Sequence, residues 1–129
     1  MGCNDYKILN EAERNHQVKT SGSYWCDRTG YSYTNSQWHG DDWYRFLSPA
    51  GTRIAEEAPG WKYCGTSASG WMQGSHPTSL GETVTRTVCF QYGYDTCNWS
   101  TEIKVRNCGQ YFLYRLVNTP YCNAGYCAK

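Results

Sequence analysis

Eight cysteines in a chain of 129 residues that has few aliphatic side chains constrain the fold more than any other feature. Only 16 residues are Leu, Ile, Val or Phe, against 6 Trp and 12 Tyr. Aromatic side chains bury large areas per residue, and each disulfide stabilises a fold by about 2–4 kcal/mol by restricting the unfolded chain. We therefore expect a folded domain with an aromatic core and with all its cysteines in disulfides. The cysteines are Cys3, Cys26, Cys64, Cys89, Cys97, Cys108, Cys122 and Cys127.

The even cysteine count also indicates a compartment. Persistent disulfides belong to oxidising environments, so we expect a secreted or extracellular protein. A zinc site is the competing interpretation, but the close pairs Cys89/Cys97 and Cys122/Cys127 lack the usual two-residue gap and have no neighbouring histidine. We expect a single domain over residues 3–127, and we interpret residues 1–2 as an initiator remnant before the mature start.

The charge balance narrows the choice of partners. The chain has 12 basic and 11 acidic residues and no basic stripe in its sequence. This predicts that neither a nucleic acid nor an acidic membrane surface is a partner. No apolar run approaches the ~20 residues of a membrane span, so membrane insertion is not expected.

The hydrophobic pattern predicts a mostly β fold with antiparallel strands, long irregular loops and at most a short N-terminal helix. Strand-like patterns occupy 42–47, 82–90, 100–107 and 110–118, and the segment 100–107 has the clearest alternation, with Ile103 and Val105 on one face. The best helical pattern lies at 5–14.

Eight fragments occur in an order that is specific to one family. They are CNDYKILNEAER, CD, WYRFLSPAGTRIAEE, CGTSASGWMQGSHP, TRTVCFQY, CNWSTEIKVRNC, YFLYRLVNTPYC and AGYC. On these fragments the chain resembles the cysteine-rich decoy-module family of uromodulin and the pancreatic zymogen-granule membrane glycoprotein.

The resemblance implies an extracellular module, and three departures carry information. Family members usually have cysteines where this chain has Ala58 and Thr96, and we expect these two positions to lie side by side as the lost halves of one bridge. Gln73 stands where uromodulin-like members can carry an N-glycan that bacterial adhesins bind. The decoy role of the family therefore does not transfer to this chain.

Two loops outside the family framework are candidate binding sites. The first holds Trp38, His39, Asp41 and Asp42, and the second holds Tyr92, Tyr94 and Asp95. Sugars pack their apolar side on aromatic faces and present hydroxyl groups to Asp, Asn, Gln or His.

Other interpretations of these two loops remain open. Trp38 could instead cap the core edge beside solvated aspartates, and a Tyr-rich surface also suits proteins. Asp41 and Asp42 are candidate calcium ligands, although calcium prefers about 6–8 oxygens. No other cofactor is expected.

The leading functional hypothesis is an extracellular carbohydrate-binding lectin, with a galactose-type sugar as the first guess. Its partners would be glycans or glycoproteins, and a homo-oligomer is an open alternative. The competing hypothesis is a protein-interaction or structural module without a sugar site. An enzyme is not expected, because the chain contains neither G-x-S-x-G nor H-E-x-x-H and we assign no catalytic residues.

Overall fold

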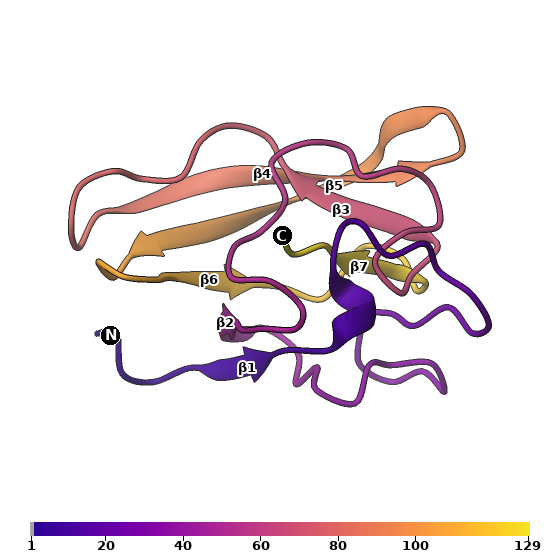
Figure 1. Ribbon diagram of the computed structural model, residues 1–129, viewed down its shortest axis with the longest axis horizontal. Coiled ribbons are helices and arrows are strands. Elements are labelled where there is room, and N and C mark those ends of the chain that lie inside the picture. Colours follow the sequence, from indigo (N-terminus) through magenta and orange to yellow (C-terminus); the bar gives the residue numbers. More distant parts are fainter. Residues whose placement is uncertain (1) are drawn as a thin grey trace.

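The computed structural model describes residues 2–129, so Met1 of the predicted initiator remnant lies outside the described residues. These residues form one seven-stranded sheet with long loops (Figure 1) and confirm the mostly β class. The elements are β1 (Lys7–Leu9), the 3-10 turn η1 (Ala12–Arg14), β2 (Asp42–Phe46), β3 (Ala68–Met72), β4 (Thr83–Tyr92), β5 (Asp95–Asn107), β6 (Phe112–Leu116) and β7 (Ala124–Tyr126).

The strand order in the sheet is β1-β2-β6-β5-β4-β3-β7. Its central pairs are antiparallel, as the sequence predicts, but both edges are parallel: β1 pairs with β2, and β7 pairs with β3. The two ends of the chain thus supply the two edge strands. The helical pattern at 5–14 is wrong for its first half, because pairing with β2 places Leu9 opposite Phe46 and buries it in the core.

The β4–β5 hairpin is the largest element and projects beyond the rest of the sheet (Figure 1). Its strands contain the predicted segment 100–107 and all but the first residue of the predicted segment 82–90. They continue to Tyr92 and Asp95, where a two-residue turn joins them. Gly93 has a φ of 62° there, a value that glycine adopts without steric cost. The alternation of β5 holds, since Ile103 and Val105 are buried while Lys104 is exposed.

All eight cysteines are paired, as predicted. The disulfides are Cys3–Cys108, Cys26–Cys122, Cys64–Cys127 and Cys89–Cys97. The first three span 105, 96 and 63 residues and fasten the N-terminal half of the chain to later segments. A disulfide that closes a longer loop restricts the unfolded chain more. These three long-range bridges therefore offset the shortage of aliphatic core residues.

Candidate functional site

The first predicted loop places Trp38 inside the protein. Trp38 is only 4% exposed and stacks on Tyr44, with ring centroids 4.8 Å apart, and on Tyr126 at 5.8 Å. Its indole N–H donates to Asn118 Oδ1 at 2.8 Å. The hypothesis of a sugar-stacking platform at Trp38 is therefore corrected, because both ring faces meet protein; the alternative, in which Trp38 belongs to the edge of the core, describes its position.

The polar neighbours of Trp38 have structural partners. Asp41 accepts a hydrogen bond from the backbone N–H of Asn118, and Asp42 accepts one from Trp43 and pairs with Lys7 at 3.4 Å. His39 is exposed. Within residues 2–129 no group of three or more His, Cys, Asp or Glu side chains is arranged to hold a metal ion. Calcium binding at Asp41 and Asp42 stays a prediction from the sequence.

The second predicted loop is the tip of the β4–β5 hairpin. Tyr94 is fully exposed at the turn, and the Asp95 carboxylate accepts a hydrogen bond from the backbone N–H of Cys97. The structure does not bring this tip to the first loop, since β5 continues from Lys104 to Asp95 beyond its pairing with β6.

Tyr92 belongs to a row of aromatic rings that sequence reasoning did not assemble. Its ring lies 5.5 Å from that of Trp61 and 5.5 Å from that of Trp99, and Trp99 stacks on Tyr121 at 4.6 Å. We call these four residues the aromatic row. The Lys62 ammonium lies over the Trp61 ring at 4.3 Å, so much of the flat surface in this row is covered by neighbouring groups.

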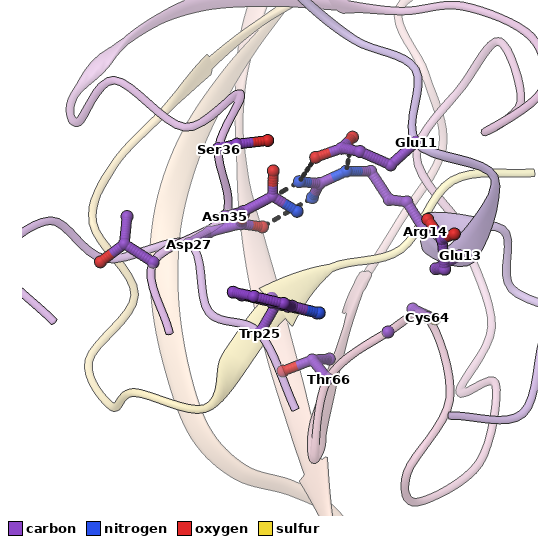
Figure 2. Close-up of a pocket in the computed structure, with 12 residues that line it drawn as sticks. Glu11, Glu13, Arg14, Trp25, Asp27, Asn35, Ser36, Cys64 and Thr66 are labelled. Carbon is purple, nitrogen blue, oxygen red and sulfur yellow. Dashed lines mark hydrogen bonds and ion pairs between the residues drawn. The ribbon is translucent and has the colours of Figure 1, made fainter. Parts of the chain in front are cut away.

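A cavity of about 180 Å³ lies beside η1 (Figure 2). Three separate segments and Gly125 build it. Its lining consists of Glu11, Glu13, Arg14, Trp25, Asp27, Thr34, Asn35, Ser36, Cys64, Gly65, Thr66 and Gly125. Most of these groups are polar, with one large aromatic ring among them.

Trp25 supplies that aromatic ring. It is 42% exposed, and its edge meets Tyr33 at a ring distance of 6.1 Å. Figure 2 shows the flat face of Trp25 turned toward the side of the cavity that holds Arg14 and Asn35. A second depression, of about 300 Å³, shares Glu13, Trp25 and Gly65 with the cavity and continues along residues 18–23.

A buried ionic network forms the base of the cavity. Arg14 is 3% exposed and donates to both oxygens of Asp27, at 2.6 and 3.0 Å, to both oxygens of Glu11, at 2.9 and 3.0 Å, and to the carbonyl of Tyr126. Every guanidinium N–H therefore has a partner, and Asp27 also accepts from the backbone N–H of Tyr126. The network fixes the cavity wall and leaves Arg14 no free donor for a ligand.

The carboxylates decide the charge state of this network. Burial by itself would lower the pKa of Arg14, but the charges of Asp27 and Glu11 outweigh burial and raise it above its ordinary value. Burial likewise opposes the charge of Glu11, yet Arg14 holds the pKa of that carboxyl below its usual range. Arg14 and Glu11 therefore stay ionised near neutral pH, and their hydrogen bonds hold the side chains in one arrangement.

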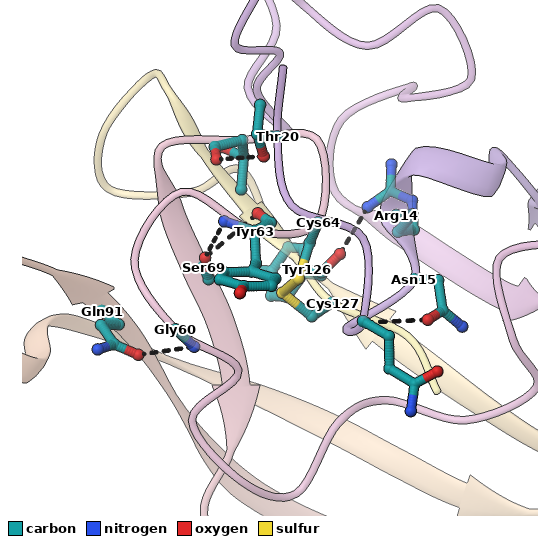
Figure 3. Close-up of a disulfide and its surroundings, with 12 residues drawn as sticks. Arg14, Asn15, Thr20, Gly60, Tyr63, Cys64, Ser69, Gln91, Tyr126 and Cys127 are labelled. Carbon is teal, nitrogen blue, oxygen red and sulfur yellow. Dashed lines mark hydrogen bonds between the residues drawn. A yellow bond between two sulfur atoms is a disulfide. The ribbon is translucent and has the colours of Figure 1, made fainter.

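The opposite rim is a strained turn held by a disulfide (Figure 3). Cys64 and Gly65 have φ values of 67° and 76°, and the Cys64–Cys127 bridge fastens this turn to the segment after β7. The Gly65 carbonyl accepts a hydrogen bond from the backbone N–H of Trp25. The turn thereby positions Trp25, and such strain is common where a binding site needs one fixed backbone shape.

Sequence reasoning missed this cavity. The segment 20–40 is rich in Ser, Thr, Gly and Asn, a composition that indicates turns and short extended pieces. A large aromatic residue at position 25 within that polar segment was the one available signal, because an exposed ring in a loop is costly unless it packs or binds. The contribution of Arg14 and Gly65 could not be seen before the chain was folded.

Comparison with known proteins fixes the family. A family model for the uromodulin-like cysteine-rich domain matches residues 44–128. The chain is 39% identical to uromodulin of Rattus norvegicus over 126 residues, which is 97% of this chain and 18% of that protein. It is 35% identical to the pancreatic secretory granule membrane major glycoprotein GP2 of Homo sapiens over 127 residues, which is 97% of this chain and 21% of that protein. This chain belongs to the uromodulin-like domain family.

The family match confirms the resemblance and the extracellular or secreted location. The chain spans about a fifth of the length of the curated relatives it matches. The range matched by the family model contains the turn at Cys64 and Gly65 but not the segment with Glu11, Arg14 and Trp25, so the cavity joins the family framework to a wall outside the matched range. None of the described helical segments is long and apolar enough to cross a bilayer.

Proposed function

We propose that this uromodulin-like module recognises carbohydrate and that the cavity beside Trp25 holds the sugar. One observation carries the proposal: a partly exposed tryptophan face lines a small polar cavity whose opposite wall is fixed by the Arg14 network. This site replaces the loop at 38–42, where Trp38 is buried. The coarser conclusion, an extracellular module, follows from the family itself.

The volume and the lining favour a single sugar residue. Pockets for drug-sized ligands occupy about 300–1,000 Å³, whereas this cavity has about 180 Å³. A pyranose ring can place its apolar side on Trp25 while its hydroxyl groups bond to the opposite wall. Glu13 and Ser36 are exposed at the rim, and their side chains make no hydrogen bond to other described residues. Both side chains are therefore available for hydrogen bonds to the hydroxyl groups of a sugar.

The depression that continues along residues 18–23 extends the site. It shares Glu13, Trp25 and Gly65 with the cavity and is lined by the hydroxyl-bearing Thr20, Ser21 and Ser23. A second sugar linked to the first would lie there. A terminal disaccharide is the ligand that this shape accommodates, and a galactose-type terminal residue is the first to test.

A glycan array tests the proposal. The wild-type module should bind at least one group of related terminal sugars, with and without a chelator, and Trp25→Ala should weaken this binding by about tenfold or more, since stacking on one ring is a large share of a millimolar interaction. Trp61→Ala, in the aromatic row, is the matched control and should bind as the wild type does. Absence of binding on a broad array would end the carbohydrate proposal.

The aromatic row supports a second candidate, a protein-interaction module. Trp61, Tyr92 and Tyr121 are 39%, 43% and 43% exposed and are linked by ring contacts through Trp99. Tyr and Trp are enriched where binding energy concentrates at protein interfaces.

A panel of extracellular glycoproteins, each used before and after enzymatic deglycosylation, separates the two candidates. Binding that survives deglycosylation and is lost in Tyr92→Ala would favour the protein-interaction module. Binding that is lost on deglycosylation and in Trp25→Ala would favour the sugar site.

A further inference from the structure

Positive charge collects on the side of the sheet that faces away from the core. Arg45 on β2, Arg115 on β6, and Lys104 and Arg106 on β5 occupy the outward positions of three neighbouring strands, while Tyr44, Tyr114 and Val105 occupy the core positions between them. We call these four cations the basic face. Glu102, also on β5, is an acidic residue on the same side.

The register brings these cations together. Arg115 lies opposite Lys104 on β5 and opposite Trp43 on β2, and Arg106 lies opposite Leu113, two residues before Arg115. Directly opposed residues in antiparallel strands are about 5 Å apart, and residues two apart along a strand about 7 Å. The cations therefore form a compact group, although they are spread over 71 positions of sequence, from 45 to 115.

Three of the four cations have no ion-pair partner among the described residues. Among residues 2–129, no carboxylate lies within ion-pair distance of Arg45, Lys104 or Arg115. Arg115 Nη1 and Arg45 Nε are buried and have no hydrogen-bond partner within the described chain. These two atoms are enclosed by the protein, but both side chains are partly exposed, and a guanidinium group without a carboxylate partner favours an anion from outside the chain.

The surroundings hold the guanidinium groups in place. The Arg45 guanidinium lies over the Tyr111 ring at 3.9 Å and donates to Tyr6 Oη at 3.0 Å. Arg106 Nε donates to the Thr83 hydroxyl at 3.0 Å. A shallow groove of about 240 Å³ runs beside Lys104 and Arg115, and it is also lined by Thr85, Glu102, Ile103 and Val117.

We propose that the basic face binds a sulfated polysaccharide. Charge complementarity favours a polyanion as the partner, because four cations gather on this face beside Glu102 while the whole chain carries a net charge of only +1. The open, shallow shape suits an extended polymer that crosses several strands better than a small enclosed anion. Sulfate oxygens can accept paired hydrogen bonds from arginine, and the extracellular location makes sulfated chains an accessible polyanion.

This inference differs from the sugar site proposed above. None of the four cations lines the cavity beside Trp25. The linear sequence has no basic stripe, but strand alternation and strand pairing build a basic surface in the fold.

Heparin-affinity chromatography at about 0.15 M salt tests the proposal, followed by titration with a size-defined heparin oligosaccharide. The wild-type module should bind heparin, and the double variant Lys104→Gln with Arg115→Gln should lose about tenfold or more in affinity with a shallower salt dependence, since fewer cations are neutralised on binding. Lys104→Gln alone, at an exposed position, should lose part of the affinity and guards against misfolding of the double variant. Glu102→Gln should bind more tightly.

Three controls distinguish binding at the basic face from other causes of heparin retention. Lys19→Gln removes one exposed cation outside the basic face and should change heparin affinity less than Lys104→Gln does. Trp25→Ala should leave heparin binding unchanged, which separates this surface from the sugar site. Desulfated heparin should not be retained. Failure of the wild type to bind heparin, equal losses in Lys19→Gln and Lys104→Gln, or equal affinity for duplex DNA or anionic lipid vesicles would overturn the proposal.

Discussion

At the scale of single residues, the Arg14 network shows how charge is used in a core with few aliphatic side chains. Arg14 and Asp27 are almost fully buried, and their charges are compensated by each other, by Glu11 and by backbone groups. Breaking such a pair leaves an uncompensated charge in a low-dielectric interior, which is costly, whereas an intact pair contributes little net stability.

Asp27→Asn therefore should be strongly destabilising. The change keeps the size of the side chain but removes the charge that Arg14 faces at 2.6 Å, and we expect the free energy of unfolding to fall by about 3 kcal/mol. Chemical denaturation under non-reducing conditions measures this quantity. Glu13→Gln, an exposed neighbour, is the control and should lie within about 0.5 kcal/mol of wild type; an Asp27→Asn variant as stable as this control would contradict the account.

The titratable groups of the core predict a loss of stability in acid. Burial lowers the pKa of His76 below 6.5, against the opposing effect of Glu56, and the pKa values of Glu11 and Glu56 are held below 4.5 by their basic partners despite burial. For each of these groups the unfolded chain binds a proton more readily than the folded protein does. The contribution of the group to stability is therefore complete above its pKa in the unfolded chain, and it is lost as the pH falls through its pKa in the folded protein.

The midpoint of thermal unfolding should accordingly decrease from pH 7 to pH 5 through His76, and fall further below pH 4.5 through the carboxylates. In His76→Gln the decrease between pH 7 and pH 5 should become smaller. A midpoint that rises as the pH is lowered from 7 to 5 would be incompatible with the packing of His76 described here.

At the scale of elements, local patterns and long-range pairing contribute differently. The alternation of Ile103 and Val105 identified β5 because its period is a local property of the chain. The pattern at 5–14 did not identify β1, because parallel pairing with β2 overrides local helical preference at Leu9. Trp38 and Trp25 both stand in polar segments, and only the folded partners, Tyr44 and Tyr126 for Trp38, decide which ring is buried.

The strained turn on the cavity rim yields a matched pair of substitutions. Gly22 and Gly65 have nearly equal φ values, 79° and 76°, but a Cβ on Gly22 would meet nothing, whereas one on Gly65 would lie 3.2 Å from Glu13 Cβ. Gly22→Ala should cost about 1 kcal/mol from backbone strain alone. Gly65→Ala should cost more, and only Gly65→Ala should weaken sugar binding, because its turn holds Trp25. Equal effects of the two changes would mean that the rim does not shape the site.

Ala58 and Thr96, the two positions at which the family usually has cysteine, lie in separate segments of the chain. Ala58 lies in a segment that is hydrogen-bonded at both ends: the Ala55 carbonyl accepts from the backbone N–H of Met72, and the Gly60 N–H donates to the Gln91 side chain. The Thr96 carbonyl accepts from the Trp71 indole N–H. Both segments thus contact the β3–β4 pair, and their proximity remains a prediction. The double variant Ala58→Cys with Thr96→Cys should form an intramolecular disulfide that a mass measurement detects. Two free thiols in the folded variant would disprove it.

At the scale of the whole molecule, the class of fold and the presence of every cysteine in a disulfide could be predicted from the sequence, but the disulfide connectivity and the surfaces could not. Cysteine count and strand periodicity are properties of the linear chain. The cavity, in contrast, gathers residues from the segments 11–14, 25–36 and 64–66, and the basic face gathers cations from β2, β5 and β6. Such sites depend on strand order and register, which the local pattern does not specify.

The central claim is that Trp25 contacts the sugar, and the six indole N–H signals of the tryptophans in a proton–nitrogen correlation spectrum test it most directly. The module is titrated with the glycan that the array retains most strongly, and the Trp25 signal is assigned by its absence in Trp25→Phe. We predict that the Trp25 signal shifts with saturation while the signals of Trp38, which is buried, and Trp61, in the aromatic row, remain in place. Movement of the Trp61 or Trp99 signal with a stationary Trp25 signal would contradict the account and place the ligand on the aromatic row.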